Sequence, residues 1–286
     1  MNLRIYENRK KFYIVSIVLL LCGIVSLLVQ GLNLGIDFQS GTLMDIKFHD
    51  GGISIAQVRS SLSAYGLENS NITQDGEGTY IIKSLELSEE TQNAILQAFR
   101  DGLGGFDLKR IESVGPIVGR ELARNGIVAL IVASALVLVY ISIRFQWEYA
   151  VSAVACLVHD CLIMLGIFSI CQFEVESSFI AAILTVIGYS INNTIVIFDR
   201  IRENRRLHAK WKGEEMVNNS VNQTMVRTIN LTMGFTLVLG SLIFLGGETT
   251  RVFAIALFIG NLAGFYSSAF ISANLWMDFR PKGIKA

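Results

Sequence analysis

Apolar residues along this chain gather into six long runs, each close to the length of about 20 residues that a helix needs to cross a bilayer. The runs lie at 12–32, 124–143, 149–171, 178–198, 228–246 and 252–277. The run that starts at Phe12 is too long for the core of a signal peptide, and no small-residue cleavage site follows it. The pattern therefore predicts six transmembrane helices, of which the first remains as an anchor.

Lysine and arginine gather on one side of these runs, in the N-terminal segment, between the fourth and fifth runs, and in the tail. They are Arg4, Arg9, Lys10, Lys11, Arg200, Arg202, Arg205, Arg206, Lys210, Lys212, Arg280, Lys282 and Lys285. The opposite connections, 172–177 and 247–251, contain only Arg251. Because positive loops stay in the cytoplasm, both termini are expected there. The expected parts are 1–32 (N-terminus and helix 1), 33–122 (an extracytoplasmic domain), 123–277 (helices 2 to 6) and 278–286 (a cytoplasmic tail).

The segment 33–122 has the short apolar stretches, some with strand spacing and some with helical spacing, of a mixed α/β domain. Alternating apolar positions predict strands, and helical spacing predicts two helices, in the order 42–49 (strand), 55–65 (helix), 72–74 and 79–85 (strands around the turn 75–78), a helix capped by Ser88, and 106–114 (strand). This β-α-β-β-α-β order matches the ferredoxin-like plan, which hosts many functions. Since no nucleophile, base or ligand set is visible there, a binding or coupling module is expected.

Composition narrows the class of protein further. Among 286 residues, 52% are hydrophobic and the formal net charge is zero, so nothing favours a nucleic-acid partner. The cysteines lie in apolar runs without metal-ligand spacing: Cys22, Cys156, Cys161 and Cys171. No P-loop, zinc motif or hydrolase triad occurs. The sequence thus predicts a mainly α-helical membrane protein that is not an enzyme and holds no cofactor or metal.

Polar residues interrupt the fourth run at Tyr189, Ser190, Asn192, Asn193 and Thr194. Such residues at membrane depth are costly and usually face a bundle interior, an ion path or a partner helix. Ser190, Asn193 and Thr194 share one helical face by their spacing. Hydrogen bonding between helices is the simpler interpretation of Asn193, and donation of its oxygen to a cation path is the alternative.

Asp160 lies near the middle of the third run. A carboxylate at the bilayer centre costs about 2.5–3.5 kcal/mol on insertion scales, so it should face the interior and be either partnered or protonated. His159 is adjacent, but side chains at i and i+1 diverge around a helix, so it need not be the partner. Ion handling and simple hydrogen bonding between helices both remain open for Asp160.

Charged residues also mark the ends of the fourth and fifth runs. Arg227 precedes the fifth run and is followed by a polar stripe that includes Thr228 and Asn230. It could extend to the lipid headgroups or face another helix, and both interpretations stay open. For Asp199, at the end of the fourth run, an ion pair with Arg200 or Arg202 is the simplest account.

The sixth run carries a small residue at every fourth position: Gly260, Gly264, Ser268 and Ser272. Such a stripe lets two helix backbones approach closely, so it predicts a tightly packed bundle.

Six spans with a large domain between the first two resemble one half of a resistance-nodulation-division (RND) transporter. Several motifs together resemble those of the SecD/SecF family of protein-export membrane proteins, on the SecF side of the pair. They are Gly35-Ile36-Asp37-Phe38, Ser40-Gly41-Thr42, Ser113-Val114-Gly115-Pro116, His159-Asp160, Gly188-Tyr189-Ser190, the FDRIREN run at 198–204 and Arg227-Thr228-Ile229-Asn230. The resemblance covers essentially the whole chain.

The resemblance implies a subunit of the bacterial plasma membrane that pairs with SecD. The pair uses the proton or sodium motive force to help draw unfolded preproteins through the SecYEG channel late in export, with YajC and YidC as further partners. The stripe on the sixth run would then partly face SecD. The family's intramembrane acid falls at Asn193 and its arginine at Arg227, so an amide stands here in place of a carboxylate.

Three functions stay open at this point. The chain could be an ion-driven accessory subunit of the secretion machinery, a half-transporter for small molecules or lipids, or a scaffold that stabilises SecD without moving ions. The single small outer domain leaves little room for a drug-binding cleft, which disfavours the second function. The neutral side chain of Asn193 gives the third some weight.

Overall fold

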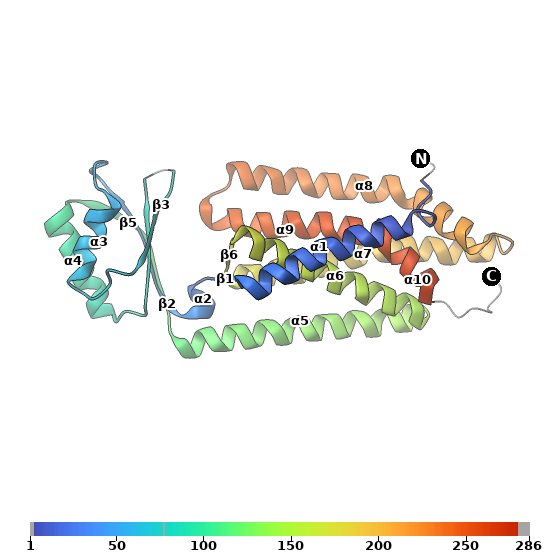
Figure 1. Cartoon of the computed structure of the whole chain (residues 1–286), viewed down its shortest axis with the longest axis horizontal. Helices are drawn as coiled ribbons and strands as arrows, with labels where there is room; N and C mark the ends of the chain where they lie inside the picture. Colours follow the sequence, from blue (N-terminus) through green and yellow to red (C-terminus); the bar gives the residue numbers. More distant parts are fainter. Residues whose placement is uncertain (1–2, 77, 280–286) are drawn as a thin grey trace. The chain divides into compact units, whose positions relative to one another are not determined.

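The computed structural model describes residues 3–76 and 78–279 of the chain. The chain forms two compact units (Figure 1). The helical unit comprises residues 1–33 and 127–286, and the α/β unit comprises residues 34–126. Most of the tail expected at 278–286 lies outside the described residues, as does Glu77 of the turn expected at 75–78.

The described part of the chain contains six helices that are long and apolar enough to cross a membrane, which confirms the predicted number. They are α1 (Arg9–Val29), α5 (Pro116–Arg144), α6 (Trp147–Cys171), α7 (Ser177–Leu207), α8 (Gly213–Leu245) and a last helix made of α9 (Glu248–Tyr266), the π-helical segment η1 (Ser267–Ser272) and α10 (Ala273–Phe279). Two further strands, β1 (Asn33–Leu34) and β6 (Glu174–Val175), are only two residues long.

The helices α7 and α8 run well past the apolar stretches that predicted them. The fourth apolar run ends near 198, whereas α7 continues to Leu207, and α8 begins at Gly213 rather than near 228. An apolar run marks only the part of a helix that would lie in lipid. The backbone hydrogen bonds of a helix continue equally well through polar residues, so the hydropathy pattern underestimated both lengths.

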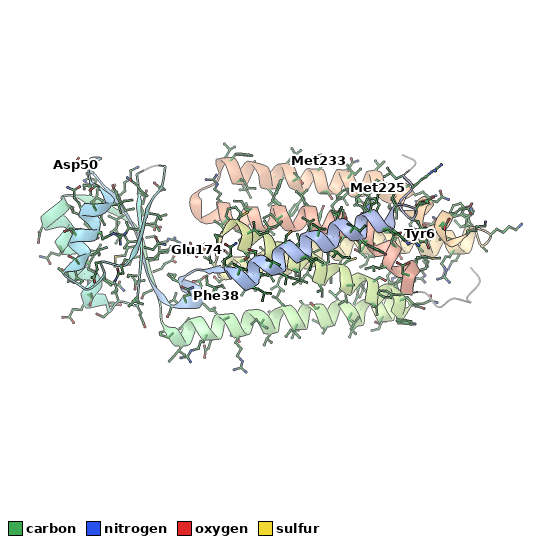
Figure 2. All side chains as sticks on the ribbon, viewed as in Figure 1. Tyr6, Phe38, Asp50, Glu174, Met225 and Met233 are labelled. Atoms are coloured by element: carbon green, nitrogen blue, oxygen red, sulfur yellow. The ribbon has the colours of Figure 1, made fainter. Side chains whose placement is uncertain are left out.

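The centre of the helical unit is formed by α6, α7 and the last helix, which contact one another. These helices bury large parts of their surfaces, whereas α1, α5 and α8 expose many apolar side chains. On α8, for example, Met225 is 2% exposed and Met233 is 53% exposed (Figure 2). Exposed apolar faces on the peripheral helices are suited to contact with lipid.

The helix α1 crosses α6 at two glycines, Gly23 and Gly166. A Cβ atom added to Gly166 would lie 2.7 Å from the Cα of Gly23, which is closer than real side chains approach. Near this crossing, the hydroxyls of Ser26 and Ser169 share a hydrogen bond of 2.7 Å. The absence of side chains at the crossing therefore sets how closely the first helix packs on the bundle.

The stripe of small residues on the last helix faces α7 and α6 of this same chain. A Cβ on Gly260 would meet Val186 and Met164, and one on Gly264 would lie 3.1 Å from the Cβ of Ser190. All four residues of the stripe are buried. The stripe does produce a close helix contact, but the expectation that it partly faces a partner subunit is wrong. A spacing pattern reveals that a close contact exists and does not reveal which helix makes it.

Two asparagines of α8 hold the N-terminal segment. The Oδ1 of Asn218 accepts hydrogen bonds from the backbone N–H groups of Ile5 (2.8 Å) and Tyr6 (2.9 Å), and Asn222 bonds both the N–H and the C=O of Leu3. The Asn218 amide also donates to the Glu7 carboxylate at 2.9 Å, which lowers the pKa of Glu7. These contacts fix the chain immediately before α1.

The α/β unit contains a four-stranded antiparallel sheet in the order β3-β4-β2-β5. Its elements are α2 (Ile36–Gln39), β2 (Gly41–Phe48), α3 (Ile55–Ser63), β3 (Asn71–Gln74), β4 (Tyr80–Ser84), α4 (Glu89–Leu103) and β5 (Phe106–Val114). Ser54 and Ser88 cap α3 and α4 by accepting hydrogen bonds from backbone N–H groups at 3.3 Å. The expected N-cap at Ser88 is thus confirmed.

The helices α3 and α4 cover one face of this sheet (Figure 1). Alternate residues of β2 point to that face and pack against apolar residues of α3 and α4. The core includes Met44, Ile46, Phe48, Val58, Leu62, Ile95 and Phe99. The alternating apolar residues of the strand and the apolar faces of the two helices therefore form a single core.

We expect Gly166→Ala to destabilise the helical unit, because its new methyl group would collide with the α1 backbone. Overpacking of this kind costs about 1–3 kcal/mol, and each kcal/mol lowers the melting temperature by roughly 2–4 °C for a protein of this size class. Gly240→Ala is the matched control, because nothing lies within 4 Å of its Cβ position. Thermal unfolding of the full chain in mild detergent measures both variants. Equal melting temperatures would show that α1 is free to move away from α6.

Candidate functional site

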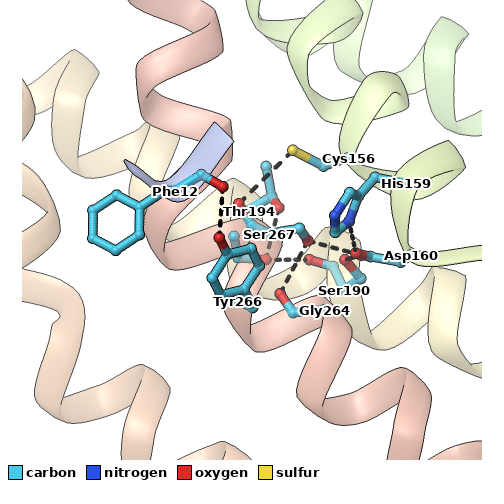
Figure 3. Close-up of polar contacts among 10 residues, drawn as sticks. Phe12, Cys156, His159, Asp160, Ser190, Thr194, Gly264, Tyr266 and Ser267 are labelled. Atoms are coloured by element: carbon cyan, nitrogen blue, oxygen red, sulfur yellow. Dashed lines mark hydrogen bonds and ion pairs between the residues drawn. The ribbon is translucent and has the colours of Figure 1, made fainter. Parts of the chain in front are cut away.

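Asp160 is 1% exposed in the middle of α6 and is held by groups from three helical segments. Its Oδ2 accepts hydrogen bonds from the hydroxyl of Ser190 on α7 (2.7 Å) and that of Ser267 at the start of η1 (2.8 Å). Its Oδ1 lies 2.9 Å from Nδ1 of His159 (Figure 3). The prediction that Asp160 faces the bundle interior and has partners is confirmed.

The π-helical segment places two adjacent serines toward two different helices. Ser267 reaches Asp160 on α6, and Ser268 shares a 3.0 Å hydrogen bond with Thr194 and donates to the Ser190 carbonyl on α7. π-Helical turns are rare and often occur at functional sites, because the extra residue in the turn redirects side chains. Nothing in the sequence pattern indicated this turn, and Ser267 was therefore missed as a partner of Asp160.

His159 is a direct partner of Asp160, although neighbouring positions diverge around a helix. The two short side chains turn along the helix surface until their polar atoms meet. The imidazole also stacks on Tyr266, with 6.3 Å between ring centroids, and Tyr266 donates to the carbonyl of Phe12 on α1 (Figure 3). Within the described residues, the buried Nε2 of His159 has no hydrogen-bond partner.

The hydrogen bonds around Asp160 are divided between its two carboxyl oxygens. Ser190 and Ser267 donate to one oxygen, and a proton on His159 Nδ1 would donate to the other. A proton on Oδ1 would instead donate to Nδ1 of a His159 tautomer that carries its own hydrogen on Nε2, and both serines would keep their acceptor. The group of His159, Asp160, Ser190 and Ser267 is called here the Asp160 cluster, and its contacts accommodate a proton on either Oδ1 or Nδ1.

Asn193 lies on the same buried face of α7 as Ser190 and Thr194, as its spacing predicted, and is 1% exposed. In the described part of the chain its side chain makes no hydrogen bond, and its Nδ2 is buried. Hydrogen bonding between helices of this chain therefore does not account for Asn193.

Arg227 and Asp199 lie apart from the Asp160 cluster. Both are exposed, and neither forms an ion pair with any residue that the structure describes. The ion pair expected for Asp199 is wrong, because Arg200 instead binds Glu203 at 2.9 Å. Arg202 turns away as well and donates to the Arg144 carbonyl. Spacing along one helix did not reveal that α5 offers a competing acceptor.

Comparison with known families gives a consistent assignment along the chain. The model described as "Protein export membrane protein SecD/SecF, C-terminal" matches residues 95–282, and "SecD/SecF GG Motif" matches residues 25–51. Similar proteins include protein translocase subunit SecF of Sebaldella termitidis, which is 38% identical, with 96% of this chain and 91% of that protein covered. SecF of Synechocystis sp. is 35% identical, with 98% of this chain and 95% of that protein covered.

Longer proteins contain a similar segment. Protein translocase subunit SecDF of Bacillus subtilis is 37% identical, with 98% of this chain but 38% of that protein covered. The crystal structure of SecDF from Thermus thermophilus, described as a translocon-associated membrane protein, matches with a TM-score of 0.85 at 32% identity, with 96% of this chain and 38% of that chain covered. The chain thus resembles one part of a larger single-chain relative.

We expect Ser190→Ala and Ser267→Ala each to destabilise the bundle, because each removes one donor from the Asp160 carboxylate. Hydrogen bonds to charged groups contribute about 1.5–3 kcal/mol. Ser272→Ala is the control, because Ser272 donates only to the Ser268 carbonyl in its own helix. Melting of the full chain in detergent compares the three variants. If all three variants melt at the same temperature, the two hydroxyls do not stabilise the buried carboxyl group of Asp160.

Proposed function

Because the chain belongs to the SecD/SecF family of protein-export membrane proteins, we propose that it acts as a SecF-type accessory subunit of the Sec protein translocase. The observation that carries this proposal is its similarity, over nearly the full length, to proteins named protein translocase subunit SecF. The six apolar helices make it a multi-pass membrane protein. We propose a role in the transport of protein rather than in catalysis, without a cofactor or a metal.

The proposed partner is SecD, in a complex that assists unfolded preproteins at the SecYEG channel, with YajC and YidC as further candidates. The SecDF relatives support this pairing, because they join such a segment to a longer chain. Polar residues exposed on α7 and α8 support it as well, namely Asn192, Arg227 and Asn230. Exposed polar groups on apolar helices are costly against lipid, and a second subunit would cover them.

The proposed location is the bacterial plasma membrane, with both termini in the cytoplasm and residues 33–122 outside. The distribution of lysine and arginine supports this orientation. We assign the ferredoxin-like plan to the outer domain. The β-α-β-β-α-β order, the antiparallel order β3-β4-β2-β5 and the shared position of both helices on one face support that assignment.

For energy coupling, we propose that the Asp160 cluster is the titratable group of this subunit and that the ion gradient acts late in export. Asn193 is neutral and cannot carry a proton. Asp160 is buried, and its three partners come from α6, α7 and η1. Protonation at Oδ2 would weaken the acceptor that Ser190 on α7 and Ser267 on η1 share, and would so favour a different packing of the helices. Asn193, Arg227 and Asp199 would shape the polar path toward SecD.

We expect Asp160→Asn to abolish the ion-dependent part of secretion while leaving assembly with SecD intact. The test reconstitutes SecYEG, SecD and the full chain into vesicles and follows late preprotein translocation with and without an imposed proton or sodium gradient. Asp107→Asn, in the α/β unit, is the matched control for loss of a carboxylate.

Several outcomes would contradict this proposal. If translocation with the parent protein does not depend on the ion gradient, only the scaffold function remains. Full activity without copurifying SecD would rule out the proposed pairing. Gradient-driven export of a small molecule or lipid without preprotein would favour the half-transporter.

We expect Asn193→Asp to leave SecD association intact and to leave ion-dependent secretion unchanged or impaired. An unpaired carboxylate at this depth costs about 2.5–3.5 kcal/mol. Asn193→Leu is the control for loss of polarity. A sharp rise in ion-dependent secretion for Asn193→Asp would place the coupling group at this position instead of at Asp160.

A further inference from the structure

Four arginines line a cavity of about 420 Å³ at one end of the helical unit: Arg144, Arg202, Arg205 and Arg206. The remaining lining residues are Phe145, Gln146 and Tyr149. The cavity lies where α5 ends, α6 begins and the last turns of α7 pass by. The proposed coupling site includes none of these arginines, and three of them, Arg144, Arg205 and Arg206, lie outside the family motifs.

The arginines are oriented by contacts that leave their charge uncompensated. The guanidinium groups of Arg144 and Arg202 lie 5.8 Å and 5.9 Å from the centre of the Phe145 ring. Arg205 donates to the side chains of Gln146 (3.3 Å) and Tyr149 (3.4 Å). Aromatic and neutral oxygen partners hold a guanidinium in place and still leave donors for an anion.

Acidic residues nearby do not neutralise this group. Asp199 and Glu203 line a neighbouring cavity together with Arg144, Arg202 and Arg206. Glu203 is already bound to Arg200, and among the described residues none of the four cavity arginines lies within ion-pair distance of a carboxylate. Four close cations repel one another, so an added anion would stabilise the arrangement.

The position of the cavity indicates the source of the anion. Ile143 and Trp147, on either side of Arg144 and Gln146, are 83% and 57% exposed and thus suited to contact with lipid. Tryptophan is enriched at the level of the headgroups, and basic pockets between transmembrane helices bind anionic headgroups. We propose that the four arginines bind the phosphate groups of an anionic phospholipid through bidentate guanidinium contacts.

The test measures binding of cardiolipin to the delipidated full chain in detergent by native mass spectrometry. Phosphatidylcholine serves as a zwitterionic comparison, and inorganic phosphate serves as a competitor. We expect cardiolipin to bind the parent at least tenfold more tightly than phosphatidylcholine, and we expect inorganic phosphate at equal concentration not to displace it. Equal binding of the two lipids would overturn the proposal. Displacement by inorganic phosphate would show that the site takes a free anion rather than a lipid.

Variants then locate the site. Arg202→Gln combined with Arg205→Gln should weaken cardiolipin binding at least tenfold. Lys11→Gln combined with Lys210→Gln removes the same charge from residues that do not line the cavity, and it should bind as the parent does. Arg202→Lys with Arg205→Lys retains charge without the forked donors, so it should bind about threefold more weakly and provides the test if the glutamine variant does not fold. Parent-like binding by the glutamine variant, or by the lysine variant, would overturn the proposal.

Discussion

The helical unit depends on one constraint: a carboxylate in the middle of an apolar bundle must obtain its hydrogen bonds from the protein. Asp160 meets this constraint with hydrogen-bond partners from its own helix, from α7 and from the last helix. These are the three helices that form the centre of the bundle. Small residues at Gly260 and Gly264 let the backbones come close enough for short hydroxyl side chains to reach the carboxylate. The close packing of these helices and the hydrogen bonding of Asp160 therefore depend on each other.

Much of this architecture followed from the sequence, because it rests on local periodicity. Six apolar runs predicted six helices, and helical spacing correctly placed Ser190, Asn193 and Thr194 on one buried face. The inward position of Asp160 followed from the cost of exposing a carboxylate to lipid. Each of these predictions depends only on the residues of one helix and on the apolar lipid that would surround it.

The remaining features depend on contacts between helices, which periodicity does not encode. The role of Ser267 depends on the π-helical turn, and the partners of Arg202 depend on where α5 ends. His159 was not predicted as the partner of Asp160, because helix geometry gives the directions of the Cβ atoms and not the reach of the side chains. The exposure of Arg227 likewise follows from which helices α8 contacts.

The π-helical segment also explains how a stripe with a spacing of four can stay in contact with its neighbours. A regular α-helix turns about 400° over four residues, so such a stripe drifts around the helix by about 40° per step. Over three steps, from Gly260 to Ser272, the drift would reach about 120° and would carry the last serine away from the contact. A π turn accommodates more residues per turn and reverses the drift. The irregular turn thus restores the rotational phase of the helix, and Ser268 and Ser272, which lie within it, remain fully buried.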